Sequence, residues 1–569
     1  MPSIKDRVKP QTALHITMVG MLVYRMLKKI ISVIRAAVLS SVIMLFYLYI
    51  TGNSVSAGRA VIMILVFMLA DVLGRTSDGA NTLGLAVVIL IIKNPYCISN
   101  AGFLMSFLAM AGIIFVKPIF SNEETIMLFF RKKKMVSITE MFIYHNIIDM
   151  LITGLCVQIA TLPVVLSMSG QIAIISLLLN IVVIPLMSVI MVSGILTGIM
   201  GLISMKAAIW TAGAGEYILD LYSWLCEKAS GSSGAVIVTG HPPEKAVVLY
   251  YVFLIVWCVI YYMKVFSGIS GKYRNVLPVI LYLIITIQLR YDTGCSMKIS
   301  MLDVGQGDSI VLQTSDGFNA LFDGGSTSKK NIGRYRIYTY LKYAGVRSLD
   351  YVFVSHPDKD HISGIYELID MCDNTFEIKN IVLPHINDTD ETLLEIRKMA
   401  DRVGINVLYA CRGDALSAGN LSISCVHPCK NYNYESANDY SAVYLISFGK
   451  FSMLMTGDAE SKAEKCLIQD ARKSDSVVDL QKLSGINVLK AGHHGSRGAS
   501  SENFLRFVKP ETALISCGVD NSYGHPHKET LQRLKEAGTK VYRTDDGGEI
   551  MVRVWEDSYA IEVFGEQKE

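Results

Sequence analysis

The chain has 569 residues, of which 51% are hydrophobic and only 18% charged, and its mean hydropathy is +0.39. Soluble globular proteins carry charge on about a quarter of their residues, so this composition excludes a wholly soluble chain. The formal net charge of +3 averages two very different halves and identifies no charged partner. Apolar runs dominate up to about Tyr291, and charged residues and turn signals are dense beyond it. We therefore expect a membrane half, residues 1–292, and a soluble half, residues 296–569.

The first half contains apolar segments suited to membrane helices, which need about 20 mostly apolar residues. Several are broken by glycine or proline, which is tolerated where neighbouring helices or a polar cavity satisfy the freed backbone groups. The pattern is compatible with a channel and equally with a packed bundle. Trp210–Cys226 is amphipathic and could lie flat or line a bundle interior, and the segment before Leu27 could be a short or re-entrant piece. The predicted spans are Ala36–Ile50, Arg59–Leu73, Asn81–Ile92, Ile98–Val116, Ile147–Ser169, Ile172–Ile203, Ala246–Phe266 and Val276–Leu289.

Lysine and arginine gather in three places in this half, Arg25–Arg35, Arg131–Lys134 and Lys264–Arg274. Such clusters favour the cytoplasmic side of a membrane. Counting the spans alternately then leaves the segment after Tyr291 outside, although the count reverses if Trp210–Cys226 also spans. We therefore expect a multi-pass cell-membrane protein whose soluble half is extracytoplasmic.

The second half begins with short strands joined by glycine-rich turns, which is typical of a meander. A further strand then runs directly into His356-Pro357-Asp358-Lys359-Asp360-His361, and a helix follows from Ile362. Catalytic groups commonly lie on loops at strand ends. The predicted elements up to this loop are strands at Met297–Leu302, Ser309–Gln313 and Ala320–Phe322, a helix at Ile337–Ala344 and a strand at Leu349–Val354.

The six-residue loop has the chemistry of a metal site. His356, Asp358, Asp360 and His361 supply two imidazoles and two carboxylates, which would be costly to bury together without a cation. Divalent ions such as zinc and manganese accept nitrogen and oxygen ligands of this kind. A solvated surface loop is the alternative reading. Four candidate ligands at a strand-to-helix junction favour the metal site.

Three later strands end in residue types that bind metals or carry protons. Phe451–Thr456 leads to Asp458, Ile486–Leu489 leads to His493 and His494, and Thr512–Ser516 precedes a loop that contains His525 and His527. One such strand end would mean little, but four in one domain indicate a single site. The eleven cysteines contain no CxxC pair and favour small buried side chains over a disulfide framework.

The order of these motifs resembles the metallo-β-lactamase fold, an αββα sandwich with a dinuclear site at one edge. Asp303-Val304-Gly305-Gln306-Gly307-Asp308, the loop His356–His361, His493-His494-Gly495-Ser496 and Gly524-His525-Pro526 resemble the C-terminal domain of ComEC-type DNA-internalisation competence proteins. In the first half, Ser56–Met63, Gly74–Asp78, Asn94-Pro95, Gly102–Phe107 and Ala160–Pro163 resemble that family's membrane domain. Thr12-Ala13-Leu14-His15 stands where the family typically has Ser-Gly-Leu-His, so we expect the chain to begin inside the channel domain.

The resemblance implies two divalent metal ions, zinc or manganese. It assigns one ion to His356 and Asp358, the other to Asp360 and His361, Asp458 as the bridging carboxylate and His493 as the late ligand, with His494 as its alternative. The remaining histidine of the family's usual set has no obvious counterpart, so Asp439 and His427 are both candidates. Ser496, His525 and His527 are candidates for substrate contact or proton delivery, or are loop-capping residues. Lys490 and Arg497, which flank the His493-His494 pair, could neutralise a backbone phosphate.

The function implied is DNA uptake in natural transformation. A membrane channel would pass single-stranded DNA inward, and the metal-dependent nuclease domain would hydrolyse the phosphodiesters of the other strand, with a DNA receptor and a translocating motor as partners. Two alternatives remain: a membrane-tethered hydrolase of another phosphoester without transport, and a transport component whose metal site is idle.

Overall fold

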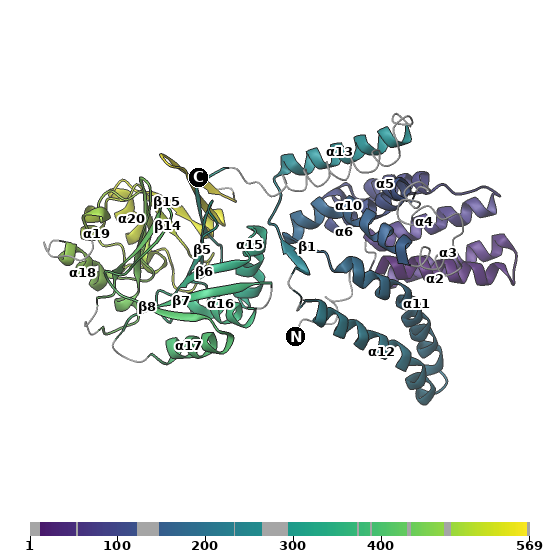
Figure 1. Cartoon of the computed structure of the whole chain (residues 1–569), viewed down its shortest axis with the longest axis horizontal. Coiled ribbons are helices and arrows are strands. Elements are labelled where there is room, and N and C mark those ends of the chain that lie inside the picture. The colour runs from purple at the N-terminus through teal and green to yellow at the C-terminus, as the bar shows by residue number, and fades with distance from the viewer. Residues whose placement is uncertain are drawn as a thin grey trace, which may run out of the picture. The chain divides into compact units, whose positions relative to one another are not determined.

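The computed structural model describes residues 12–52, 55–121, 147–230, 232, 234–263, 294–372, 375–386, 390–429, 434–471 and 480–565. The chain divides into two compact units, Met1–Asp292 and Thr293–Glu569 (Figure 1). Each unit has its own buried apolar clusters, and each is described by itself.

The first unit is helical, with a small two-stranded sheet formed by β1 (Gln171–Ala173) and β2 (Val236–Val238). The longest helices, α11 and α12, pack along each other, and the Tyr222 hydroxyl donates to the carbonyl of Val183 at 2.7 Å. The helices are α2 (Thr12–Lys28), α3 (Val33–Ile50), α4 (Val55–Val72), α5 (Gly79–Lys93), η1 (Pro95–Ser99), α6 (Ala101–Ala111), η2 (Gly112–Val116), α7 (Lys117–Phe120), α10 (Asp149–Ser169), α11 (Ser176–Gly201), α12 (Met205–Ser230) and α13 (Glu244–Tyr262).

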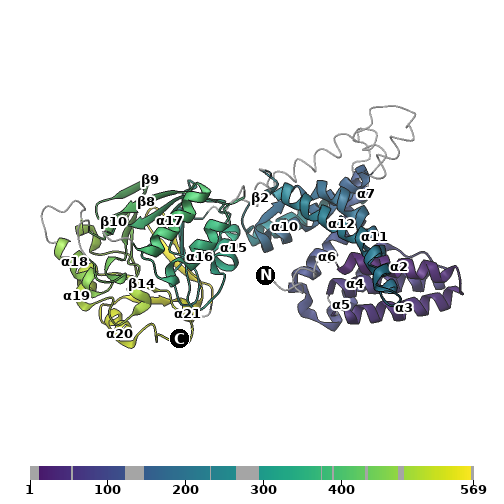
Figure 2. The ribbon, with the colours of Figure 1, turned by 90° about the horizontal axis from the view of Figure 1, so that it is seen from below.

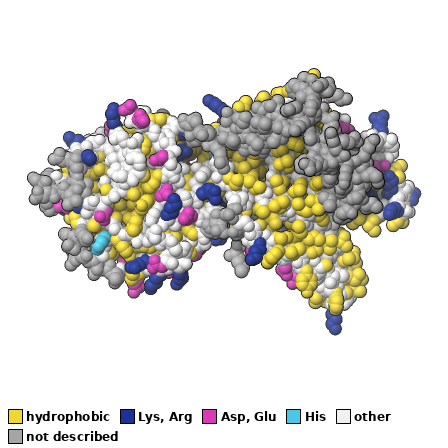
Figure 3. Space-filling model, in the orientation of Figure 1, with side chains coloured by type: hydrophobic (Ala, Val, Ile, Leu, Met, Phe, Trp, Pro, Cys, Tyr) yellow, Lys and Arg dark blue, Asp and Glu magenta, His cyan; other side chains and the backbone are white. Residues whose placement is uncertain are grey.

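Five stretches in the described part of this unit are long and apolar enough to cross a membrane: α3, the continuous stretch Ala101–Phe120, α10, α11 and α13. Only 11% of the most apolar part of α11 and of α13 is buried within the chain. Hydrophobic side chains accordingly cover much of the visible face of this unit (Figure 3). An apolar surface of this extent is stable against lipid rather than water, so the prediction of a multi-pass membrane half is confirmed.

The helix boundaries differ from the prediction in three places. The predicted span Ile172–Ile203 begins too early, because Ile172 belongs to β1 and pairs with Ile237 of β2. The segment Trp210–Cys226 is part of the much longer α12, and its acidic residues Glu216 and Asp220 are exposed. The segment before Leu27 is a helix of 17 residues, α2. The predicted span Val276–Leu289 lies outside the described residues.

The second unit contains two mixed β-sheets. In the described residues the larger has eight strands in the order β17-β16-β3-β4-β5-β6-β7-β8, and the smaller has seven in the order β15-β14-β13-β12-β11-β10-β9. The strands are β3 (Met297–Met301), β4 (Ile310–Thr314), β5 (Asn319–Phe322), β6 (Ser348–Phe353), β7 (Glu377–Pro384), β8 (Asn406–Ala410), β9 (Ala415–Ala418), β10 (Leu421–His427), β11 (Val443–Phe448), β12 (Phe451–Met455), β13 (Val488–Lys490), β14 (Thr512–Ile515), β15 (Lys540–Arg543), β16 (Ile550–Val554) and β17 (Tyr559–Val563).

Helices cover the outer face of each sheet (Figures 1 and 2). One apolar cluster fills the space between the sheets and includes Ile299 and Met453. A second lies between the larger sheet and its helices, and a third between the smaller sheet and its helices. The four layers form the predicted αββα sandwich. The covering helices are η4 (Gly333–Ile337), α15 (Tyr338–Tyr343), α16 (Lys359–Asp370) and α17 (Glu391–Val403) on one side, and α18 (Ser461–Ala471), α19 (Glu502–Val508) and α20 (Lys528–Glu536) on the other.

The parallel parts of both sheets direct their carboxyl ends to one edge. Strand β5 is parallel to β6, with Phe322 opposite Phe353. Strand β12 is parallel to β13, which is parallel to β14, with Met455 opposite Lys490 and Lys490 opposite Leu514. The loops after these strands therefore emerge together. The strands predicted to precede the candidate ligands are confirmed within one or two residues.

Candidate metal centre

The loop between β6 and α16 carries the first group of candidate ligands. His356 follows the strand and is fully buried, and Asp358 is the N-cap of α16. Asp360 and His361 occupy the first turn of that helix, so their side chains stay close to the loop. Two glycines make this packing possible, because a Cβ at Gly307 or Gly325 would collide with the backbone around Asp360.

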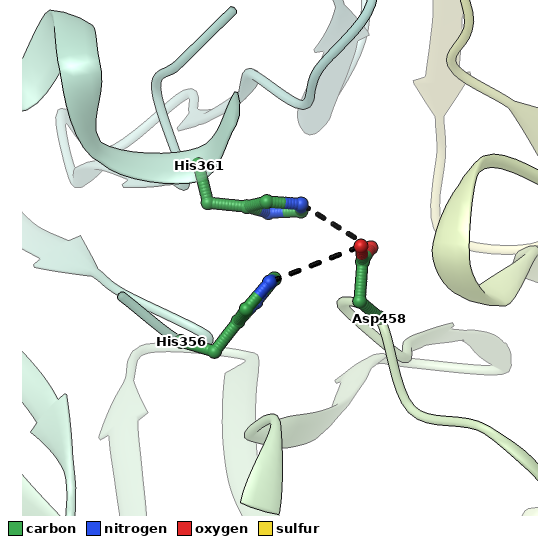
Figure 4. Close-up of side chains that lie close together, drawn as sticks. All are labelled: His356, His361 and Asp458. Atoms are coloured by element: carbon green, nitrogen blue, oxygen red, sulfur yellow. Dashed lines mark ion pairs between the residues drawn. The ribbon is translucent and has the colours of Figure 1, made fainter. Parts of the chain in front are cut away.

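Asp458 lies at the centre of the site, directly after β12. Its Oδ1 lies 3.2 Å from His361 Nε2, and its Oδ2 lies 3.8 Å from His356 Nε2 (Figure 4). The backbone N–H of Asp458 donates to Ser441 Oγ at 2.9 Å, which fixes the loop. The preceding Gly457 has a φ of +50°, and a Cβ there would collide with Ser441. Figure 4 shows the imidazoles of His356 and His361, which follow the larger sheet, directed at the carboxylate of Asp458, which follows the smaller sheet.

Two consecutive histidines after β13 complete the cluster. His493 and His494 have φ values of 46° and 53°, the left-handed region that non-glycine residues seldom occupy. His494 is fully buried, and its Nε2 lies 3.4 Å from Asp360 Oδ2 and 3.6 Å from Asp458 Oδ2. His493 Nε2 also lies 3.6 Å from Asp458 Oδ2, with its side chain 28% exposed. The unusual backbone thus presents both imidazoles to one carboxylate.

The other ring nitrogen of these histidines is held by a hydrogen-bond acceptor. His361 Nδ1 donates to Asp323 Oδ2 at 2.9 Å, His493 Nδ1 to Glu460 Oε1 at 2.7 Å and His494 Nδ1 to the Ser516 carbonyl at 2.9 Å. An Nδ1–H donor leaves Nε2 with a free lone pair directed at the centre. Metal-binding histidines are characteristically oriented by such carboxylate or carbonyl partners.

Several polar atoms at this centre are buried without a hydrogen-bond partner in the described structure. They are Nε2 of His356, His361 and His494, and Oδ1 of Asp458. Buried polar atoms are normally satisfied, so a converging set of unsatisfied lone pairs calls for a cation. Groups of three ligand atoms that lie within 4.8 Å of one another include His356 with His361 and Asp458, and Asp360 with His361 and His494. The residues therefore fit divalent metal ions.

The electrostatic field of the cluster favours positive charge. Burial opposes the charged form of His361, yet Asp458 and Asp323 raise its pKa well above the usual value. Burial also opposes the charge on His494, yet Asp458 and Asp308 raise its pKa to about 9. The same carboxylates that favour protons on these rings would favour metal ions between them.

Lys490 is the fixed cation of the site. Its side chain is 1% exposed, and it forms an ion pair with Asp308 and donates to the Gly457 carbonyl at 2.7 Å. The sequence suggests that Lys490 could neutralise a backbone phosphate, but its ammonium lies inside the protein and neutralises Asp308. Arg497, the other flanking cation, is exposed and pairs with Glu529 at 2.9 Å.

The three predicted substrate-contacting residues lie in different surroundings. The ring of His525 lies 5.4 Å from that of the candidate ligand His493, and the ring of His527 lies 5.0 Å from that of His525. Burial and the neighbouring histidines lower the pKa of His525 to about 4. Ser496 instead donates to Glu460 at 3.2 Å and accepts from the backbone of Gly498, which is the position of a loop-capping residue.

The structure does not bring Asp439 or His427 to the centre. The Asp439 carboxylate lies 3.4 Å from Lys462 Nζ, and its backbone carbonyl accepts from His427 Nε2 at 2.8 Å. Neither side chain belongs to a group of potential ligands among the described residues. The 3₁₀ turn Asn438–Tyr440 directs the Asp439 side chain toward α18.

Three residues of the site are not predicted from the sequence, namely Asp308, Asp323 and Glu460, and neither is the internal position of Lys490. Asp308 and Asp323 each follow a recognised glycine-rich turn or strand end, which was the available signal. Glu460 follows Asp458 by two residues, but only the fold brings it to His493.

Comparisons with known proteins agree with this arrangement. Residues 14–264 match the family model described as Competence protein, and residues 302–414 match that of the metallo-beta-lactamase superfamily. ComE operon protein 3 of Bacillus subtilis is 25% identical over 94% of this chain and 65% of its own length. Competence protein ComA of Neisseria gonorrhoeae is 25% identical over 94% of this chain and 69% of its own length. The chain thus spans about two thirds of the length of these relatives.

A third relative and one solved structure match mainly parts of the chain. Recombination protein 2 of Haemophilus influenzae is 29% identical over 47% of this chain and 30% of its own length. The metallo-beta-lactamase fold protein YhfI of Bacillus subtilis is similar with a TM-score of 0.30 and 14% identity, over 44% of this chain and 98% of that chain. By its relatives and its family-model matches, the chain is a homologue of competence proteins in which residues 14–264 match a competence model and residues 302–414 match a metallo-beta-lactamase superfamily model.

Proposed function

We propose that the chain acts in DNA uptake during natural transformation. The membrane unit passes single-stranded DNA inward, and the second unit hydrolyses phosphodiesters of the strand that is not imported. The observation that carries the hydrolase part is the convergence of four histidine Nε2 atoms on the buried Asp458 carboxylate. The transport part rests on the relationship to competence proteins along 94% of the chain.

The cluster suits two divalent ions that share Asp458. We assign one ion to the neighbourhood of His356, Asp358 and Asp458, and the other to Asp360, His361, His494 and Asp458, with His493 at the exposed side. The local charge supports more than one ion, because six carboxylates and one ammonium leave five negative charges. These charged residues are Asp308, Asp323, Asp358, Asp360, Asp458, Glu460 and Lys490. Histidine and carboxylate ligands without cysteine are compatible with zinc or manganese.

Two such ions, when bound, supply a hydroxide that is nucleophilic near neutral pH and stabilise a phosphoryl oxygen. The residues of the chain hold this centre in place. Asp323 and Glu460 orient His361 and His493, and Asp458 holds its position through its backbone bond to Ser441. His525 is neutral at physiological pH because its pKa is lowered to about 4. A neutral ring of such low basicity serves as a hydrogen-bonding group rather than as a general base.

We place the hydrolase unit outside the cytoplasmic membrane. The support is the concentration of Lys and Arg in Arg25–Arg35, Arg131–Lys134 and Lys264–Arg274, which favours the cytoplasmic side. An external hydrolase meets incoming DNA before transport. A receptor that delivers DNA and a motor that pulls it inward would then be partners of the chain.

The nuclease part is tested with the full chain in detergent. Cleavage of an end-labelled single-stranded oligonucleotide should require added Mn²⁺ or Zn²⁺ and should be lost in Asp360→Ala, because that carboxylate faces the site. Asp370→Ala is the matched control, since Asp370 is an exposed carboxylate at the far end of the same helix. Equal cleavage by wild type and Asp360→Ala would exclude this site as the nuclease.

Two further functions are separated by the same variants in cells. A hydrolase that acts on another phosphoester without transport predicts normal DNA uptake after deletion of the chain. A transport component with an idle metal site predicts uptake that depends on the membrane unit and is unaffected by Asp360→Ala. DNA uptake through a chain with an active nuclease predicts loss of uptake on deletion together with loss of metal-dependent cleavage in Asp360→Ala. We favour this last outcome because the competence-domain match covers residues 14–264.

A further inference from the structure

A buried ammonium lies behind the proposed metal centre. Lys490 is the last residue of β13, and its Nζ pairs with Asp308, lies 3.7 Å from Asp458 Oδ1 and donates to the Gly457 carbonyl. All three partners are oxygen ligands. The Asp308 and Asp458 side chains are 2% and 3% exposed. The ammonium thus occupies a position with the ligands and charge of a cation site.

The acidic residues around this position would accept a metal ion by their own geometry. Asp308, Asp458 and His494 form one group of potential ligands within 4.8 Å of one another, and Asp308, Asp323 and His361 form another. The Nδ1 atoms that face Asp308 are already used as donors, by His494 to Ser516 and by His361 to Asp323. A cation next to Asp308 would therefore be bound by oxygen atoms rather than by these two nitrogen atoms.

A cavity adjoins this position. Asp308, Asp323, Ser355, Tyr444 and Lys490 are among the residues that line it. The hydroxyl of Tyr444 is buried and has no hydrogen-bond partner among the described residues. The cavity therefore places a few polar groups beside the ammonium, while the rest of its lining, including Ile310, Phe322 and Phe353, is apolar.

We propose that the Lys490 ammonium is a built-in cation that occupies an oxygen-lined ion site formed by Asp308, Asp458 and the Gly457 carbonyl, and so excludes a further metal ion from it. The inference rests on the proposed function in one respect, namely that divalent ions bind at the outer face of Asp458. Lys490 is then a positioning residue. It neutralises Asp308 permanently and leaves the Asp458 carboxylate to the outer ions.

Removing the ammonium should open the site. Lys490→Met keeps an unbranched side chain of similar length and deletes the charge. Asp308, Asp458 and the Gly457 carbonyl then form a set of oxygen ligands, which hard ions such as Mn²⁺ and Mg²⁺ prefer. An uncompensated buried carboxylate is strongly unfavourable, which adds to the drive to bind an ion.

The test counts metal ions on the full chain in detergent. Wild type, Lys490→Met and the double variant Asp308→Asn/Lys490→Met are stripped with a chelator, equilibrated with Mn²⁺ and desalted, and bound manganese is measured by elemental analysis. We expect two ions on wild type, one additional ion on Lys490→Met and two again on the double variant. The double variant is the matched control because it removes both members of the buried pair, which is tolerated far better than removing one.

The same number of ions on folded Lys490→Met and on wild type would overturn the inference, and so would the additional ion on the double variant. If Lys490→Met does not fold, the double variant decides: recovery of folding with two ions supports the inference, and failure to fold overturns it. Fewer than two ions on wild type would contradict the proposed metal centre instead, so the two failures are distinguishable.

Discussion

Asp323 orients the candidate metal ligand His361, and the hydrogen bonds that it accepts set the expected loss of metal affinity when it is replaced. Three donors converge on this carboxylate: His361 Nδ1 at 2.9 Å, and the backbone N–H and the hydroxyl of Ser355, both at 2.7 Å. Asp323→Asn keeps the shape and the left-handed backbone at this position, where φ is 55°. The substitution removes the negative charge. It also replaces one accepting oxygen with an NH₂ group, which cannot accept a hydrogen bond from the donor that faces it.

Loss of a carboxylate that orients a metal-binding histidine weakens metal binding by about 10- to 100-fold, or about 1.4 to 2.7 kcal/mol. We expect this loss in Asp323→Asn, measured by competition titration of the chelator-stripped full chain with Zn²⁺ or Mn²⁺. A separate cost of about 1 to 3 kcal/mol from the unsatisfied donor should lower the thermal stability of the metal-free chain.

The matched control is Asp350→Asn. Asp350 also accepts a backbone N–H, from Asn319 at 2.9 Å, and pairs with Lys379 at 2.8 Å, but it makes no contact with the cluster among the described residues. It should lose stability without losing metal affinity. An affinity of Asp323→Asn within about twofold of the control would refute the reasoning that this carboxylate orients His361.

Three other predictions concern single residues of the second unit. His494→Asn should weaken metal binding more than His493→Asn, because His494 is fully buried and faces two carboxylates, whereas His493 is 28% exposed; equal losses in a metal titration would contradict this. Burial lowers the pKa of His427 to about 4, so the folded state binds fewer protons than the unfolded state, and stability is present above pH ~6.5 and is lost as pH falls toward 4. His427→Gln should flatten this loss, which is at most about 3 kcal/mol, in thermal unfolding at several pH values. Gly333→Ala should destabilise by about 1 to 3 kcal/mol, because its Cβ would collide with the Gly364 carbonyl, and an unchanged melting temperature would disprove that packing.

The sequence predicted the strand ends of the hydrolase unit well. The strands that precede the candidate ligands are short, mostly apolar runs, and buried parallel strands have that pattern. His356, Asp360, His361 and Asp458 could be recognised because they lie in the loops, or in the first turn of the helix, that follow such runs.

Other features depend on contacts between distant segments and left no local signal. The orientation of His494 requires the left-handed backbone at both histidines and a carbonyl acceptor from Ser516 after the next strand. The direction of the Asp439 side chain is set by a 3₁₀ turn and by Lys462 on α18. Spacing along the sequence placed Asp439 near the motif but could not orient it.

In the membrane half, too, local sequence predicted some features, whereas contacts between distant segments set others. Hydropathy identified the long apolar helices because lipid imposes a length and composition on each span. The pairing of Ile172 with Ile237 could not be read in this way, since a three-residue strand in an apolar segment looks like the start of the following helix. Its partner strand lies more than sixty residues further along the chain.

We propose that Asp458 holds two divalent ions and that this centre cleaves DNA phosphodiesters. The most direct measurement is a titration of the metal-free full chain with Mn²⁺ while cleavage of an end-labelled single-stranded oligonucleotide is followed. We expect no cleavage without metal, activity that saturates at two ions per chain, and loss of both metal binding and cleavage in Asp458→Asn. Cleavage that persists in the chelator-stripped chain, or that is equal in Asp458→Asn and wild type, would contradict this proposal.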